Sequence, residues 1–296
     1  MKTQKTAEST SVKSLRTRLR VALRGIPIIP VIILLAFIFI GIFGSFIAPH
    51  NPLDAEFSMT TKPPFWQEGG SLSYPLGTDS LGRDLLSRLL VGSRVSLVVG
   101  FIVVIFSGIV GSTIAMLSGY LGGWVDSILM RITDTMLSLP PLMIAIVVAA
   151  IVGPSKQTLI IILVIVGWAG YARILRGEVL RIRESKFIQL AVTAGCSKLR
   201  IMLVHIFPNI LNSLVVLGTL QLGIVIIAES SLSFLGVGVP PPEPAWGTMV
   251  ADGRRYIGHA WWLITWPGLS ILLVVLSCNL VGDWLRVRFD PKFRQI

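Results

Sequence analysis

Residues 173–209 read RILRGEVLRIRESKFIQLAVTAGCSKLRIMLVHIFPN, and this stretch decides the fold. It lies between two long apolar runs and holds seven Lys and Arg against two acids. Seven cations do not fit in hydrocarbon, and an excess of Lys and Arg is typical of cytoplasmic loops. The stretch therefore predicts an ordered cytoplasmic excursion between two membrane spans. Residues 187–194 and 198–207 are compatible with two short helices, and Gly195 permits a turn between them.

The composition of the whole chain is that of a multi-pass membrane protein. Of its 296 residues 53% are hydrophobic and only 14% are charged, and the mean hydropathy is +0.78. The net charge is +11, but the basic residues flank apolar runs instead of alternating with aromatic side chains. This pattern indicates topology and anionic lipid, and argues against nucleic acid as a partner. The two cysteines, Cys196 and Cys278, imply no disulfide framework.

The apolar runs predict an all-α protein with six transmembrane helices. Residues 1–25 form a basic tail, 26–48 the first span, 49–94 an external loop, 95–285 a core with five spans, and 286–296 a second tail. The run at 26–48 is too long for a signal peptide and has no clean cleavage site after it. Lys and Arg are more frequent on the side that holds both tails and residues 173–207, so we expect both termini in the cytoplasm.

A spaced pattern within the first stretch resembles a known motif. Gln189, Leu190 and Ala191 are followed after three residues by Gly195 and, further on, by Pro208. The pattern is similar to the Glu-Ala-Ala, Gly and Pro pattern in the cytoplasmic loop of bacterial ABC importer membrane subunits, with Gln189 in place of the acid. The resemblance implies that the loop at 173–207 couples to an ATPase; the alternative is a solvated basic loop. The residues that it assigns to coupling are Glu184, Phe187, Gln189, Leu190, Ala191, Gly195, His205 and Pro208.

Three further blocks resemble one subgroup of that family, the C-type membrane subunits of dipeptide, oligopeptide and nickel importers. The first is the sequence GTDxxGRDxxSR at residues 77–88, in which Asp79 or Ser80 is expected to cap a short helix. The second is LSFLG at residues 232–236, which leads to a proline-rich loop ending in Trp246 and Gly247. The third is GDxLRxxxDP at residues 282–291. The resemblance implies a type I ABC importer permease fold in a bacterial inner membrane.

Polar or helix-breaking residues inside spans are candidates for a pathway or gate. Pro140 and Pro141 fall in the third predicted span, at 128–152, where adjacent prolines kink or break the helix, either for gating or simply to fit its shape. Gln221 and Glu229 fall in the fifth, at 203–234. An acid at membrane depth is a functional candidate, although Glu229 could also lie at the outer interface. In the third span, the spacing of Arg131 and Asp134 favours a pair on one helix face.

The chain lacks motifs for catalysis or nucleotide binding. It contains no GxxxxGK[ST] phosphate loop and no GxSxG nucleophile motif, and its three histidines, His50, His205 and His259, lie in separate segments. We therefore expect a non-catalytic subunit with no cofactor of its own. The resemblance implies a paired B-type permease subunit, two cytoplasmic ATPase subunits that bind ATP and Mg²⁺, and an extracytoplasmic binding protein.

The expected function is to form half of the translocation pathway of an ATP-driven importer, for dipeptides or oligopeptides, or for nickel or another small solute. A stand-alone secondary transporter and a lipid-modifying enzyme are the other classes considered. The former usually carries internal repeats or intramembrane ionisable relays, and the latter needs clustered His, Asp or Cys at one depth. The sequence offers none of these signals clearly.

Overall fold

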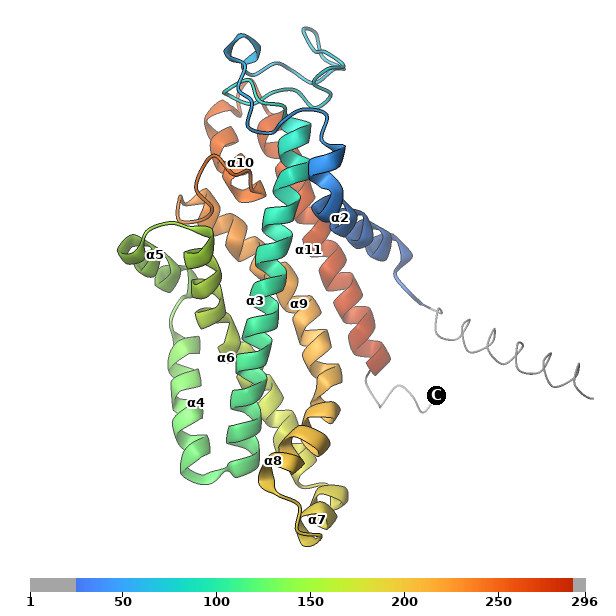
Figure 1. The fold of residues 1–296 in the computed structure, drawn as a ribbon, viewed down its shortest axis with the longest axis vertical. Coiled ribbons are helices and arrows are strands. Elements are labelled where there is room, and N and C mark those ends of the chain that lie inside the picture. Colours follow the sequence, from blue (N-terminus) through green and yellow to red (C-terminus); the bar gives the residue numbers. More distant parts are fainter. Residues whose placement is uncertain (1–24, 290–296) are drawn as a thin grey trace, which may run out of the picture.

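The computed structural model describes residues 25–289, so most of both predicted tails lies outside the described residues. Within this range the chain is built from helices and turns, and its one β feature is an isolated bridge between Thr78 and Asp84. The all-α prediction is confirmed. The bundle is elongated: loops and the short helix α10 (Trp246–Gly253) lie at one end, and the short helices α7 (Lys186–Thr193) and α8 (Lys198–Arg200) lie at the other (Figure 1).

Five helices among the described residues are long and apolar enough to cross a membrane. A sixth span results if a sharply bent helix pair, α4 (Gly123–Ser138) and α5 (Pro141–Val152), is taken as one. The five long helices are α2 (Ile28–Ile47), α3 (Leu85–Leu121), α6 (Lys156–Arg183), the run Lys198–Phe234 that ends in α9 (Phe207–Phe234), and α11 (Trp262–Phe289).

Helix α3 begins ten residues before the predicted second span, so the external loop ends at Asp84. The expected short helix capped by Asp79 or Ser80 is wrong, because Asp84 is the N-cap and its carboxylate accepts from the Ser87 N–H at 2.9 Å. Hydropathy marks only the part of a helix that lies in hydrocarbon, whereas a side-chain cap marks where the helix begins. Arg88 therefore belongs to the first turns of α3 and not to a separate element.

The third predicted span is broken into two helices. Its halves, α4 and α5, meet at an angle of 87°. Pro141 forces Pro140 into an extended conformation, with ψ at 122°, and neither proline can donate a backbone hydrogen bond. The proline pair thus ends one helix and starts the next, so that of the predicted kink or break the structure has the break.

Helix α6 continues to Arg183, so residues 173–183 are part of a membrane helix and not of the loop predicted at 173–207. Two ion pairs with α4 hold this extension. Arg176 binds both carboxylate oxygens of Asp126, at 2.6 and 2.5 Å, and Arg173 contacts Asp134. The expected pair of Arg131 with Asp134 is therefore wrong, because Asp134 finds a partner on the neighbouring helix.

The core of the bundle is α3, which packs against α2, α6 and α9. Its contact with α6 depends on glycines that leave no room for a side chain. A Cβ at Gly111 would lie 2.7 Å from the Trp168 carbonyl oxygen, and one at Gly119 would lie 2.8 Å from Val179. Close packing of small residues is a main source of association between helices in lipid, so α3 and α6 form a tightly fitted pair.

Candidate functional site

The predicted loop forms a protrusion at one end of the bundle, which we define as residues 184–206. It follows α6, contains α7, the turn at Gly195 and α8, and returns through the π-helix η2 (Ile201–Ile206) into α9 (Figure 1). Ser197 caps α8, because its hydroxyl accepts from the Arg200 N–H at 3.3 Å. The protrusion is therefore an ordered structure whose two ends are continuous with membrane helices.

Helix α7 has a buried face and an exposed face. Ile188 is 2% exposed and packs in a cluster with Ile201 and Ile206, which anchors α7 to the return segment. Phe187 and Leu190, three residues apart, are 46% and 69% exposed on the outer face. Neighbouring exposed apolar side chains on one face of a helix mark a surface suited to a partner protein. Of the expected coupling residues, Phe187 and Leu190 thus point outward, whereas Ala191 packs partly inward.

Gly195 terminates α7 in the way that a left-handed glycine permits. Its φ is +77°, its N–H donates to the Val192 carbonyl at 3.0 Å, and the Cys196 N–H donates to the Ala191 carbonyl at 3.1 Å. This pair of bonds is the Schellman motif, which requires a residue that tolerates positive φ. A Cβ at position 195 would meet no atom within 4 Å, so the requirement is one of backbone conformation and not of space.

Gln189 is exposed, and its Nε2 donates to the Glu184 carbonyl at 3.3 Å. A glutamate at this position would have no donor for that carbonyl. The neutral amide therefore closes the first turn of the protrusion in a way that the acid of the common motif does not. Glu184 itself is exposed as the C-cap of α6.

His205 and Pro208 mark the re-entry into α9. Pro208 has no N–H for the Val204 carbonyl, and the Phe207 N–H instead bonds five residues back to the Met202 carbonyl. The wider π-helical hydrogen bonding of η2 follows from this arrangement, and such segments are frequent at functional sites. His205 is half-buried, and its carbonyl accepts from the Asn209 side chain at 2.6 Å.

A cleft of about 480 Å³ separates α7 from the end of α3. It is lined on one side by Tyr120 and Leu121, and on the other by Ile188, Gln189, Val192 and Thr193 of α7, together with Arg183 and Lys198. The protrusion therefore presents an apolar outer face and, beside it, a basic concave face.

The four candidate pathway residues do not form one site. Pro140 and Pro141 are exposed at the break between α4 and α5, and Gln221 is half-buried in the middle of α9. Glu229 is fully buried between α9 and α3, where the hydroxyls of Ser96, Ser233 and Ser230 lie 3.0, 2.9 and 3.3 Å from its carboxylate oxygens. The structure thus places Glu229 inside the fold of this chain.

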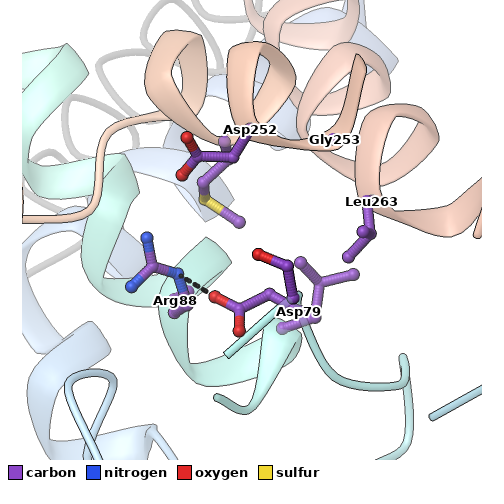
Figure 2. A pocket seen from close by; sticks show the side chains of 8 residues that line it. Asp79, Arg88, Asp252, Gly253 and Leu263 are labelled. Atoms are coloured by element: carbon purple, nitrogen blue, oxygen red, sulfur yellow. Dashed lines mark ion pairs between the residues drawn. The ribbon is translucent and has the colours of Figure 1, made fainter. Parts of the chain in front are cut away.

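The opposite end of the bundle contains a buried cluster of charged side chains. Asp79, Arg83 and Arg88 belong to the motif at residues 77–88, but the sequence did not predict that they meet. Asp79 accepts from the Arg83 side chain at 2.7 Å, and the Arg88 guanidinium lies 3.3 Å from the same carboxylate. Figure 2 shows Asp252 of α10 facing this pair across a small cavity of about 10 Å³. Burial raises the pKa of Asp252, while Arg88 and Arg83 act to lower it. The Asp79 carboxylate thus ties the external loop to α3, and Asp252 of α10 faces this pair.

The fold and the protrusion define a class, the membrane-embedded permease components of solute importers. Residues 111–295 match the family described as "Binding-protein-dependent transport system inner membrane component", and the chain belongs to this family. It is a multi-pass permease subunit of the ABC importer type, and the expected resemblance is confirmed.

Several characterised relatives are similar over most of their length. The chain is 41% identical over 261 residues to the di/tripeptide transport system permease protein DppC of Pseudomonas aeruginosa (strain UCBPP-PA14), covering 88% of this chain and 86% of that protein. It is 43% identical over 258 residues to the dipeptide transport system permease protein DppC of Escherichia coli (strain K12), covering 87% and 86%.

A solved structure supports the fold. A chain of the MetNI methionine ABC transporter in inward-facing conformations aligns with a TM-score of 0.57 at 18% identity, covering 69% of this chain and 97% of that chain. This likeness extends to the helical architecture alone.

Proposed function

We propose that this chain forms half of the translocation pathway of an ATP-driven importer of dipeptides or short oligopeptides. The relatives that are about 40% identical over most of their length carry di- and tripeptide transport in their names, which supports a peptide substrate. The sequence blocks at 77–88 and 232–247 resemble those of the subgroup of dipeptide, oligopeptide and nickel importers. A second, paralogous permease subunit completes the pathway, and an extracytoplasmic binding protein delivers the peptide to the end that holds α10.

The observation that carries the energy-coupling role is the exposed apolar face of α7. Phe187 and Leu190 are displayed on a short helix whose inner face is fixed by Ile188, at the tip of a protrusion joined to two membrane helices. A short helix with such a face fits the groove of a partner protein. We propose that each importer contains two cytoplasmic ATPase subunits, that these bind ATP and Mg²⁺, and that this chain contributes no cofactor.

The distribution of basic residues indicates which end of the bundle faces the cytoplasm. Arg181, Arg183, Lys186 and Lys198 surround the protrusion, and the positive-inside rule assigns this end to the cytoplasm. Both termini then lie in the cytoplasm of a bacterial cell, and α10 lies on the outer side of the inner membrane.

Affinity purification of the tagged subunit in mild detergent tests the coupling role. Wild type should recover a P-loop ATPase and a second permease subunit. Leu190→Asp should lose the ATPase and keep the second permease subunit, because it places a charge on the apolar face. Leu72→Asp is the matched control, since Leu72 is 79% exposed but lies in the external loop, away from the protrusion. Wild type without an ATPase would contradict the proposal and favour a secondary transporter.

The substrate class is tested by uptake into proteoliposomes that contain the recovered complex and its binding protein. A labelled dipeptide should accumulate only with ATP, and unlabelled di- and tripeptides should compete. Accumulation of nickel without competition by peptides would assign the importer to the metal branch of the subgroup.

A further inference from the structure

Glu229 differs from the other polar side chains of α9 in its surroundings. Its carboxyl group is fully buried and lies within hydrogen-bonding distance of three serine hydroxyls. Ser230 and Ser233 belong to α9 itself, whereas Ser96 belongs to α3. Among residues 25–289, the bond from Ser96 to Glu229 is the only side-chain hydrogen bond that joins α9 to another membrane-spanning helix.

The rest of the contact between α3 and α9 consists of glycines packed against apolar side chains. Gly100 of α3 lies against Leu222 and Ile226, where an added Cβ would be 2.9 and 3.4 Å away, and Gly218 of α9 lies against Val104 at 3.4 Å. Contacts of this kind keep the two helices close but contain no directional bond. The bond from Ser96 to the Glu229 carboxyl is directional. Moving α9 away from α3 would break this bond and leave the buried carboxyl with only the two serine hydroxyls of its own helix, which is costly at membrane depth.

The external segment rests on the same serines. A Cβ at Gly247, in the first turn of α10, would lie 2.6 Å from the Ser230 Cα and 2.8 Å from the Ser233 Cβ. The Trp246 side chain donates to the Leu89 carbonyl of α3 at 3.1 Å. Helix α10 is therefore placed against α9 and α3 at the level of the Glu229 cluster.

We infer that Glu229 is a positioning residue that fixes the external end of α9 to α3 and makes this end the pivot of α9. The opposite end of α9 continues into η2 and the protrusion, where the hydrogen bonding is wider and the chain is not tied to α3 by a side-chain hydrogen bond among the described residues. Resting on the proposed coupling role, a displacement of the protrusion tilts α9 about Glu229.

Spin-label distances measure the pivot directly. Labels are placed at Val98 of α3 and Ile227 of α9, both exposed, in the full chain with Cys196→Ser and Cys278→Ala. Glu229→Ala should broaden the distance distribution, and Ser96→Ala should broaden it less. Glu229→Gln should keep it narrow, because the amide still accepts a hydroxyl hydrogen bond. Ser231→Ala is the matched control, since the Ser231 hydroxyl bonds only within α9, to the Ile227 carbonyl.

The same variants are then compared in the assembled transporter. In Glu229→Ala, peptide imported per ATP hydrolysed should fall roughly tenfold, the factor expected when a buried hydrogen-bonded group is lost. Glu229→Gln should restore the ratio to within about twofold of wild type. A role in stability alone would lower the yield of complex and leave this ratio unchanged, which would overturn the inference.

Two results separate the pivot from the proposed function. The distance measurement needs neither ATPase nor substrate, so it remains decisive if the importer proves to carry another solute or to lack an ATPase. Glu229→Ala with a wild-type distance distribution refutes the pivot. If that variant fails to insert, Ser96→Ala decides the question, and a distribution identical to that of Ser231→Ala refutes it equally.

Discussion

Gly195 gives a prediction in which backbone conformation and side-chain size can be told apart. At φ of +77° a residue with a Cβ costs about 1–2 kcal/mol, whereas the empty space around position 195 adds no clash. Gly195→Ala and Gly195→Trp should therefore weaken the Schellman turn by the same amount. Gly195→Asn should cost less, because asparagine tolerates the left-handed region.

Hydrogen exchange of the free permease measures this cost. The amides of Gly195 and Cys196 donate the two bonds of the turn, so a loss of about 1–2 kcal/mol should raise their exchange about 5–30-fold. Gly177 of α6 provides the control, because it is equally open but has helical φ. Gly177→Ala should leave the exchange of the turn unchanged.

Two results would refute the reasoning. Exchange in Gly195→Ala at the wild-type rate would mean that the turn does not depend on left-handed conformation. Much faster exchange in Gly195→Trp than in Gly195→Ala would mean that side-chain volume, and not φ, limits the position.

Three further predictions address the remaining contacts. Gln189→Glu removes the donor to the Glu184 carbonyl, an exposed bond worth at most about 1 kcal/mol, so ATPase recovery in the purification should stay within about fivefold of wild type. Gly111→Ala should destabilise the α3 and α6 pair by about 1–3 kcal/mol in thermal unfolding in detergent, because the methyl group would meet backbone atoms. Asp79→Asn leaves two buried guanidinium groups without a carboxylate and should cost about 3–5 kcal/mol in the same assay, whereas Lys156→Ala breaks an exposed pair and should cost under about 1 kcal/mol.

The sequence predicts the helical class and the protrusion because both depend on local composition. Long apolar runs require helices in lipid, and a cluster of cations between two runs has to leave it. The error at residues 173–183 has the same origin, because a cluster of charges marks the end of an apolar run and not the end of a helix. Arg173 and Arg176 remain helical because α4 supplies Asp134 and Asp126, and no local pattern predicts that pairing.

The contacts that define the polar sites are long-range and escape local reasoning. Ser96 and Glu229 are 133 residues apart, and Ser96 is one of many small residues in its helix. The motif at residues 77–88 could be recognised, but the convergence of Arg83 and Arg88 on Asp79 requires the loop to fold back on α3. Gly195 is the opposite case: its place after a helix-forming run predicted the turn, although the reason is φ and not bulk.

The salt bridges between α4 and α6 mechanically connect α4 to the protrusion. Arg176 and Asp126 join the two helices just above the point where α6 enters the protrusion, so a force applied there is carried sideways into α4 as well as upward along α6. Trp124, 75% exposed at the start of α4, lies on that branch. A fluorophore in place of Trp124 would therefore report a displacement of the protrusion that reaches α4.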